Sequence, residues 1–431
     1  MNLEINNIGK IRKARIDLRG LTVIVGDNNA GKSTIGKILA TLFYIFPTLE
    51  KRILRARALY VFDDEVVRFA HRFRMIDDDD FRNCLDNVSL TESDFESVMT
   101  KTWLDSERFW GDSSEKEVKL TKEKQATIKS SAHVAFARLN ECRGIPDGDL
   151  ANVEVGKMFS MFFNRFVKRV GEPEGSIILN TDDGQTKITF SENANCESST
   201  KFTNRGWFLG SPLLINNITR SGFRRAEPEP MHQPLMWKLN DFKEINSVAK
   251  AVVQDKLGAV ASRIEEILGG KMYYSEEKDE LMISGEGYPE PLPVKSLSMG
   301  LKAFAVLFWM LEIEALRTGD VLVLDEPENH LHPSWQIRYA EIVVLLQKYF
   351  DLKVLLTTHS PYFLEAIQLF AQKYGTEGVL DAYQPEFDDD GSTVTFLNKI
   401  TDNAVLYRKF TAPLRSLDVL RAEMRSQKEP R

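Results

Sequence analysis

The chain has 431 residues, of which 43% are hydrophobic and 10% aromatic, an ordinary composition for a globular protein of two or three domains. Its formal net charge of -7 excludes a surface coated with phosphate-binding residues, because Lys and Arg dominate affinity for nucleic acid. Any contact with nucleic acid must therefore be a local basic patch.

Cysteine usage and hydropathy favour a cytoplasmic protein with no membrane partner. Cys84, Cys142 and Cys196 lack the spacing of a zinc site and are interpreted as reduced thiols. The first residues, MNLEINNIG, have no basic flank followed by an apolar core, so no secretory signal is expected. The longest apolar stretch, 303–311, is too short to span a bilayer.

The N-terminal segment predicts a strand, loop and helix in succession. Short strands are expected at 3–5 and 14–18, followed by a continuously apolar strand, LTVIV, at 21–25. The loop GDNNAGKST follows at once. Apolar residues at helical spacing over 35–46 then predict a helix packed on a sheet.

The middle of the chain contains helical and β-rich segments in succession. Charged sequence with helical periodicity over 49–170 predicts a helical insertion. An Asp-Gly turn between two β-rich runs predicts a hairpin over 176–190. A strand is expected at 212–215, and a long amphipathic helix is expected over 239–268, where two glycines stop it.

A compact C-terminal block starts near residue 291. It contains SLSMGLKAF and an apolar helix, then the strand VLVLDEPE, a helix over 333–349 and the strand KVLLTTHSP. This alternation predicts a parallel sheet with crossover helices, and two further strands with a terminal helix are expected to finish the chain.

Four segments summarise the predicted organisation. Residues 1–48 form the first part of an α/β head with its phosphate loop, and 49–170 form the helical insertion. Residues 171–290 form a β-rich remainder of the first lobe plus a long helix. Residues 291–431 form the C-terminal lobe and tail.

The loop after the apolar strand predicts a phosphate site. Its glycines let successive N–H groups point inward, and the following helix directs its positive dipole end at the same anion. Lys32 adds a charge on the β- and γ-phosphates, and Ser33 offers a hydroxyl to Mg²⁺. The expected phosphate-binding residues are Asn28, Asn29, Ala30, Gly31, Lys32, Ser33 and Thr34.

Acidic residues after the strand at 321–324 predict the second half of this site. Asp325 is expected to hold Mg²⁺ through water, and Glu326 to orient or deprotonate the attacking water. His359 follows the next apolar strand. A lone histidine there is more often structural, but its position favours contact with the γ-phosphate or the lytic water.

With these motifs in order, the chain resembles ABC-type ATPases, and within them the RecF, Rad50, SMC and OLD-like group. The matching segments are GDNNAGKST, SLSMGLKAF, VLVLDEPENHLHP and LLTTHSP. The resemblance implies an ABC-ATPase head with a mixed sheet and a P-loop core, which uses ATP and Mg²⁺. A transporter subunit is disfavoured, because the span between phosphate loop and signature is too long for a compact transporter head.

The resemblance also implies a dimer or a higher homo-oligomer. Ser298 and Gly300 match the signature loop, which in such proteins grips the γ-phosphate bound to the opposite subunit. His332 departs from the aspartate of transporter-type members. For His330 and His332, an interface role is preferred over a metal pair. The Mg²⁺-sensing glutamine of the family is not assigned.

The run from Ser298 through SPYFLEAI resembles ATPase subunits of bacterial anti-phage systems, such as the Septu ATPase PtuA, including retron-linked forms, and the ATPase of PARIS. That likeness implies a separately encoded effector, commonly an HNH or Toprim nuclease. A nuclease within this chain is rejected, because Glu377, Asp381 and the acids at 388–390 lie in a tail too short for a Toprim fold.

A DNA-repair or DNA-organising ATPase is the competing hypothesis. Basic sequences motivate it: KIRKAR at 10–15, KRILRAR at 51–57, and Arg220 with Arg224 and Arg225. Such runs are more often solvated helix faces than nucleic-acid sites.

Overall fold

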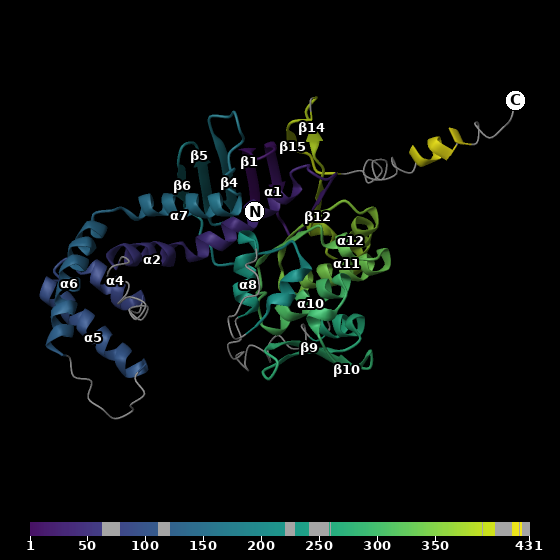
Figure 1. Cartoon of the computed structure of the whole chain (residues 1–431). Helices are drawn as coiled ribbons and strands as arrows, with labels where there is room; N and C mark the ends of the chain where they lie inside the picture. The colour runs from purple at the N-terminus through teal and green to yellow at the C-terminus, as the bar shows by residue number, and fades with distance from the viewer. Residues whose placement is uncertain are drawn as a thin grey trace. The chain divides into compact units, whose positions relative to one another are not determined.

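The computed structural model describes residues 1–62, 78–110, 121–219, 229–240, 258, 260–389, 391–400, 416–421 and 423–424. The chain divides into two compact units (Figure 1). Met1–Pro47 and Met158–Arg431 form the first, here called the head, and Thr48–Lys157 form the second, here called the insertion.

A five-stranded parallel sheet lies at the centre of the head. Its strand order is β13-β3-β12-β11-β7. The strands are β3 (Leu21–Val25), β7 (Gly206–Leu209), β11 (Val321–Asp325), β12 (Lys353–Thr358) and β13 (Leu380–Tyr383). Because all five run parallel, the loops after β3, β11 and β12 emerge at the same edge.

Helices bury the apolar strands of this sheet. They are α1 (Lys32–Ile45), α8 (Gln233–Leu239), α10 (Met299–Glu312), α11 (Pro333–Phe350) and α12 (Pro361–Tyr374), the last three grouped together in green in Figure 1. Gly36 brings α1 close to the sheet, since a Cβ there would lie 2.7 Å from Cγ1 of Val323. The helix that starts at the phosphate loop is thereby held against β11.

A seven-stranded sheet forms the other layer of the head, in the order β14-β15-β2-β1-β4-β5-β6. Its strands are β1 (Asn2–Ile8), β2 (Ile11–Asp17), β4 (Gly175–Thr181), β5 (Gly184–Phe190), β6 (Ala194–Ser198), β14 (Glu386–Phe387) and β15 (Val394–Phe396). Neighbours are antiparallel except β15 and β2. A Cβ on Gly31 would lie 3.2 Å from Ile11 and 3.3 Å from Val394, so the phosphate loop packs on this sheet.

A small antiparallel sheet and several 3-10 turns complete the head. The sheet consists of β8 (Lys271–Ser275), β9 (Glu280–Gly285) and β10 (Tyr288–Pro293). The turns are η1 (Phe46–Thr48), η2 (Pro212–Asn217), η3 (Pro230–His232), η4 (Val294–Ser296), η5 (Pro327–His330) and η6 (Glu377–Val379). The sequence analysis did not predict this sheet.

The insertion is helical in its described residues. Its helices are α2 (Leu49–Val61), α4 (Asp78–Asp86), α5 (Glu92–Trp110), α6 (Lys122–Arg143) and α7 (Asp147–Phe162), of which α7 runs on into the head. Buried residues recur along α6 at helical spacing, at Ile128, Ala132, Ala135, Leu139 and Cys142. This face joins Phe95 and Met99 in a separate apolar core.

The predicted fold class is confirmed: the chain is α/β, with a mixed-sheet, P-loop head and a large helical insertion. The strand at 21–25 and the hairpin at 176–190 are also confirmed. Among the described residues, no helix is both long and apolar enough to cross a membrane.

Two predicted elements are wrong in part. The strand expected at 212–215 is the 3-10 turn η2, because Ser211 caps its first turn and Pro212 begins it; the strand, β7, lies just before. The start of the helix expected over 239–268 is wrong, because α8 ends at Leu239 and Asn240 follows it. Residues 241–257 lie outside the described part, whereas residues 260–268 are helical, as expected, and Gly269, with φ 70°, follows them.

Candidate nucleotide site

The phosphate loop connects β3 to α1 in the conformation that its glycines allow. Gly31, the residue before α1, has φ 77°, and Asn29 has φ 63°. No side chain caps the N-terminus of α1. The first N–H groups of this helix can therefore be satisfied by an anion.

Lys32 connects this loop to the acid pair. Its side chain is only 3% exposed, and its Nζ donates to the carbonyl oxygens of Gly26 and Asp27, each at 2.8 Å. The same Nζ lies 3.0 Å from Oε1 of Glu326. Two motifs separated by nearly three hundred residues thus meet at one buried ammonium group.

The acid pair follows β11, which lies between β12 and β7. Oδ1 of Asp325 accepts a 2.7 Å hydrogen bond from Oγ1 of Thr357, and the backbone N–H of Glu326 donates to the same hydroxyl at 3.0 Å. Glu326 has φ 48°, a left-handed conformation that costs a non-glycine residue about 1 kcal/mol or more. The fold holds this residue in a strained position that directs its carboxylate toward Lys32.

The carboxyl of Glu326 stays ionised in this setting. Burial opposes its charged form, but hydrogen bonds from Asn329 and Lys32 outweigh burial and lower its pKa. The Asn329 amide donates to Oε2 at 3.0 Å. A carboxylate held in this way can orient a water molecule or accept its proton.

His359 lies beside this carboxylate. Its Nδ1 is 3.7 Å from Oε2 of Glu326 and 3.5 Å from Oε1 of Glu328. The side chain is 42% exposed, so the ring can reach a bound molecule at this edge. The structure therefore brings together Lys32, Asp325, Glu326 and His359, as the sequence predicts.

The signature residues lie elsewhere on the head. Ser298 is exposed and caps α10, with its Oγ accepting from the N–H of Leu301 at 3.4 Å. A Cβ on Gly300 would lie 2.8 Å from the Trp335 ring, so glycine is required for this packing. Among the described residues, no hydrogen bond or ion pair joins these two residues to the phosphate loop of the same chain.

His330 and His332 are both exposed, and His332 caps α11 through its Nδ1, which accepts from the N–H of Ser334 at 3.3 Å. Within the described residues, no group of three or more His, Cys, Asp or Glu side chains is arranged to hold a metal ion. Their suggested interface role remains a prediction.

Sequence reasoning missed three polar residues at this edge of the sheet. Thr357 bonds both members of the acid pair, and Glu328 bonds the segment that carries His359. His232, a buried residue next to Gly210, has an Nε2 without a hydrogen-bond partner in the described structure, and burial lowers its pKa. The position of each of these residues depends on contacts between segments that are distant in the sequence. Only Glu328 could have been noticed beforehand, because it follows the acid pair in the segment PENH.

Two families of ATPase domain match this chain. Residues 1–141 match a family described as "AAA ATPase domain", and residues 199–365 match "AAA domain, putative AbiEii toxin, Type IV TA system". The first match contains Lys32, and the second contains Glu326 and His359. Both matches are to ATPase domains, and each covers less than half of the chain. These matches support an ATPase that uses ATP.

Solved structures with a similar arrangement include an SMC head domain from Thermotoga maritima, at 11% identity over 93% of this chain and 98% of that one, with a TM-score of 0.41. An Smc head domain from Pyrococcus furiosus with an extended coiled coil, bound to the C-terminal domain of ScpA, has 11% identity over 97% and 98%, with a TM-score of 0.34. A comparison with curated proteins found no match.

Proposed function

We propose that this chain hydrolyses ATP in a site completed by a second copy of itself, and that the cycle regulates a separately encoded nuclease or toxin in anti-phage defence. The observation that carries the ATPase proposal is the 3.0 Å contact between Nζ of Lys32 and Oε1 of Glu326. It joins a phosphate-binding loop to a carboxylate placed to act on water.

Binding follows from the loop and helix. Backbone N–H groups of the loop and of the first turn of α1 donate to the phosphates, and Lys32 exchanges its bonds with Gly26, Asp27 and Glu326 for phosphate oxygens. That exchange releases Glu326 from its cation. Nucleotide binding thereby prepares the carboxylate for its role.

Oxygen donors at the site fit magnesium. Ser33 supplies a hydroxyl on α1, and Asp325 supplies a carboxylate whose Oδ1 is held by Thr357. Mg²⁺ prefers hard oxygen ligands and, when bound, neutralises charge on the phosphates. Ser33 and Asp325 are the residues that would hold it.

Hydrolysis is assigned to Glu326 and His359. Glu326 orients or deprotonates the attacking water, because its carboxylate is ionised and lies beyond the proposed metal ligand. The His359 ring, 3.7 Å from that carboxylate, contacts the γ-phosphate or the same water.

Ser298 and Gly300 contact the nucleotide of a second copy in this proposal. Both lie at the N-terminus of α10, where Ser298 is exposed to a partner. The test is the mass of Glu326→Gln in solution. Addition of ATP should double the mass of the Glu326→Gln variant. Adding Ser298→Arg to that variant should prevent the doubling. A mass that ATP leaves unchanged contradicts the dimer.

The defence role is supported by the family description that names a toxin of a toxin–antitoxin system. The effector proposed from the sequence is an HNH or Toprim nuclease encoded separately. Purification with the neighbouring gene product tests this role. Co-elution and an ATP-dependent change in the activity of that product support it, whereas neither effect being present counts decisively against it.

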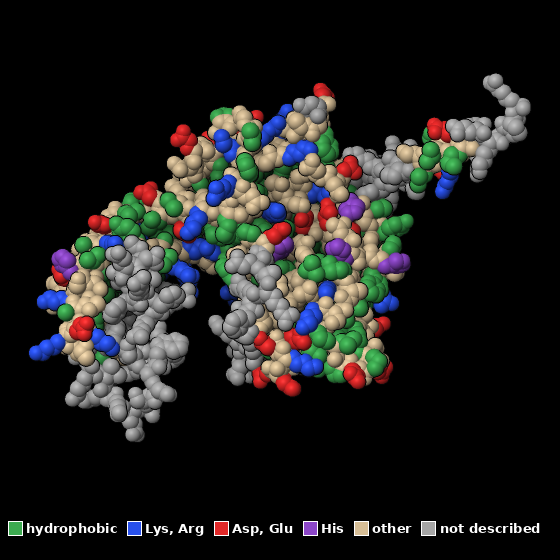
Figure 2. Space-filling view, viewed as in Figure 1, with side chains coloured by type: hydrophobic (Ala, Val, Ile, Leu, Met, Phe, Trp, Pro, Cys, Tyr) green, Lys and Arg blue, Asp and Glu red, His purple; other side chains and the backbone are tan. Residues whose placement is uncertain are grey.

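Direct binding of DNA is the second candidate. Exposed basic residues support it: Arg12 and Lys13 on β2, and Lys51 and Arg55 on α2. On the face drawn in Figure 2, Lys and Arg side chains are interspersed with Asp and Glu, which reduces any attraction for a polyanion. The cluster of Arg220, Arg224 and Arg225 lies outside the described residues.

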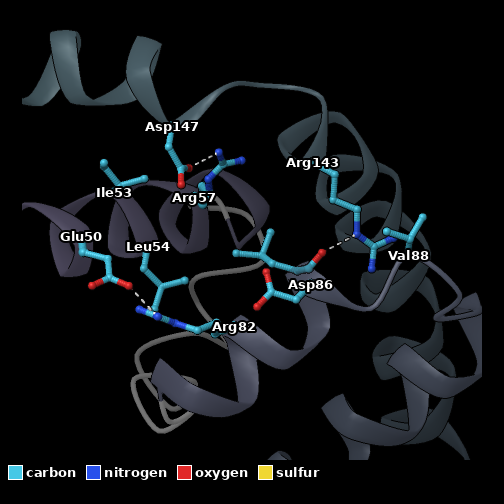
Figure 3. Close-up of a pocket in the computed structure, with 10 residues that line it drawn as sticks. Glu50, Ile53, Leu54, Arg57, Arg82, Asp86, Val88, Arg143 and Asp147 are labelled. Atoms are coloured by element: carbon cyan, nitrogen blue, oxygen red, sulfur yellow. Dashed lines mark hydrogen bonds and ion pairs between the residues drawn. The ribbon is translucent and has the colours of Figure 1, made fainter. Parts of the chain in front are cut away.

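The basic patch expected at 51–57 is wrong for Arg57. Its guanidinium is buried and donates to the carbonyls of Cys142 and Ile145 and to Asp147, as Figure 3 shows for the last. It borders a cavity of about 390 Å³ in the insertion, which Arg82 and Arg143 also line. Arg57 is therefore bonded within the insertion and does not belong to the exposed basic face of α2.

Salt dependence separates the two candidates. If DNA binds the insertion, Lys51→Gln with Arg55→Gln should weaken binding and reduce the slope of log affinity against log salt by about two. Glu50→Gln is a control on the same helix. No binding at low salt removes this candidate.

A further inference from the structure

A buried carboxylate ties together the two loops that carry the proposed catalytic groups. Glu328, in η5, is 3% exposed. Its Oε1 accepts hydrogen bonds from Oγ1 of Thr358 at 2.5 Å and from the backbone N–H of His359 at 2.9 Å. The segment after β11 is thus joined to the segment after β12.

These bonds fix the backbone of His359 more firmly than its ring contacts do. Nδ1 lies 3.5 Å from Glu328 and 3.7 Å from Glu326, both at or beyond the limit of a good hydrogen bond. The ring is only partly held by packing, since the side chain is 42% exposed. Its position therefore depends on where Glu328 holds the main chain.

A second, uncharged link supports the same loop. Oγ of Ser360 donates to Oε1 of Gln336 at 2.6 Å, and Nε2 of Gln336 donates to the carbonyl of Leu331 at 3.1 Å. The N–H of Ser360 also donates to Oγ1 of Thr358 at 3.0 Å. Glu328 is thus part of a buried network whose other buried side chains, those of Thr358, Ser360 and Gln336, carry no charge.

The two glutamates of this motif experience opposite surroundings. Oε2 of Glu328 is buried without a hydrogen-bond partner in the described structure, whereas both oxygens of Glu326 contact donors. Burial raises the pKa of Glu328, while Asn329 and Lys32 overcome burial and lower that of Glu326. An ionised Oε2 without a donor is costly in the interior, and the cost is smaller for a neutral group.

We propose that Glu328 is a positioning residue for His359, and that it acts as a hydrogen-bond acceptor through Oε1 rather than as a negative charge. It holds the main chain at His359 so that the ring stays beside Glu326. This role deepens the proposed function and rests on it, because Glu326 and His359 matter only if the site hydrolyses ATP.

Two substitutions with a matched control test the acceptor role. Glu328→Gln keeps an acceptor oxygen and should retain at least about a third of wild-type kcat, whereas Glu328→Leu should lower kcat roughly 10- to 100-fold with nucleotide Kd within about threefold. Glu326→Gln is the control, since there the charge itself is needed. Equal losses in Glu328→Gln and Glu326→Gln would overturn the proposal.

A double-mutant comparison separates positioning from simple stability. If Glu328 acts through His359, adding Glu328→Leu to the His359→Ala variant should lower its kcat by less than about twofold. Full additivity of the two losses contradicts the proposal. Thermal unfolding of each variant shows whether the fold survives.

Histidine-ring NMR gives a readout that does not need activity. The His359 signals should move or broaden in Glu328→Leu and stay near their wild-type positions in Glu328→Gln. Unchanged signals in Glu328→Leu overturn the proposal. If the wild-type chain fails to hydrolyse ATP, the proposed function fails, and the NMR result still decides whether Glu328 positions His359.

Discussion

The head and the insertion use buried charged residues in different ways. In the head, Lys32 is buried against a carboxylate at the edge of a sheet, where strand ends leave polar groups that a ligand can reach. In the insertion, Arg57 is buried against the carbonyls of Cys142 and Ile145, where it joins the end of α6 to the loop after it. In the proposed function, Lys32 exchanges its bonds for those to a ligand, whereas Arg57 keeps its bonds.

Helix geometry explains why Arg57 is buried although its basic neighbours are exposed. Leu54, Arg57 and Val61 are spaced by three and four residues and lie on the buried face of α2. Lys51 and Arg55 lie on its exposed face. A run of basic letters therefore indicates a basic surface only after the helical face of each residue is known.

The largest expected effect comes from Lys32→Ala. Nucleotide Kd should rise more than about 100-fold, because the variant has no ammonium group to form charge-assisted bonds to phosphate. Fluorescent-nucleotide titration measures it. Lys187→Ala, which removes an exposed lysine on β5, is the matched control and should bind as wild type does. Tight binding by Lys32→Ala would mean that the head, like the insertion, uses its buried cation for structure alone.

Arg57→Leu should produce the opposite pattern. It leaves the carbonyls of Cys142 and Ile145 and the Asp147 carboxylate without their donor, at a cost of about 3 kcal/mol. Hydrogen exchange in the full chain should accelerate across the insertion helices α2, α4, α5 and α6, with nucleotide Kd unchanged. Arg55→Leu on the exposed face should alter neither quantity. Exchange that stays slow in Arg57→Leu contradicts the structural role.

A smaller effect is expected at Asp381, where the head also contains a structural charge. The carboxyl is buried, and its hydrogen bonds with Arg19 and Lys399 outweigh burial and lower its pKa. Its contribution is therefore complete above the unfolded pKa, near pH 4, and is lost as pH falls through the folded value. Asp381→Asn should lower the free energy of unfolding by about 2 kcal/mol at pH 7. Denaturant unfolding should show this difference between wild type and variant becoming smaller below about pH 4. A difference that does not change with pH would exclude the ion pairs as its cause.

Sequence alone predicts the parts of the site that depend on local geometry. The roles proposed for Gly31, Lys32 and Ser33 depend on one loop and the helix after it, so their spacing is enough to predict them. The bond from Thr358 to Glu328 joins segments thirty residues apart, and no local pattern specifies it. Strands β8 to β10 were missed for a related reason: Lys271–Ser275 has little apolar alternation, and pairing with neighbours creates the sheet.

Single-turnover hydrolysis by Glu326→Gln tests the central claim most directly. Bound ATP should persist, with cleavage slowed about 100-fold or more relative to wild type while nucleotide Kd stays within about threefold, because the amide keeps the shape of the carboxylate and cannot accept a proton. Cleavage at the wild-type rate would contradict the account, since the carboxylate that meets Lys32 would then have no part in the reaction.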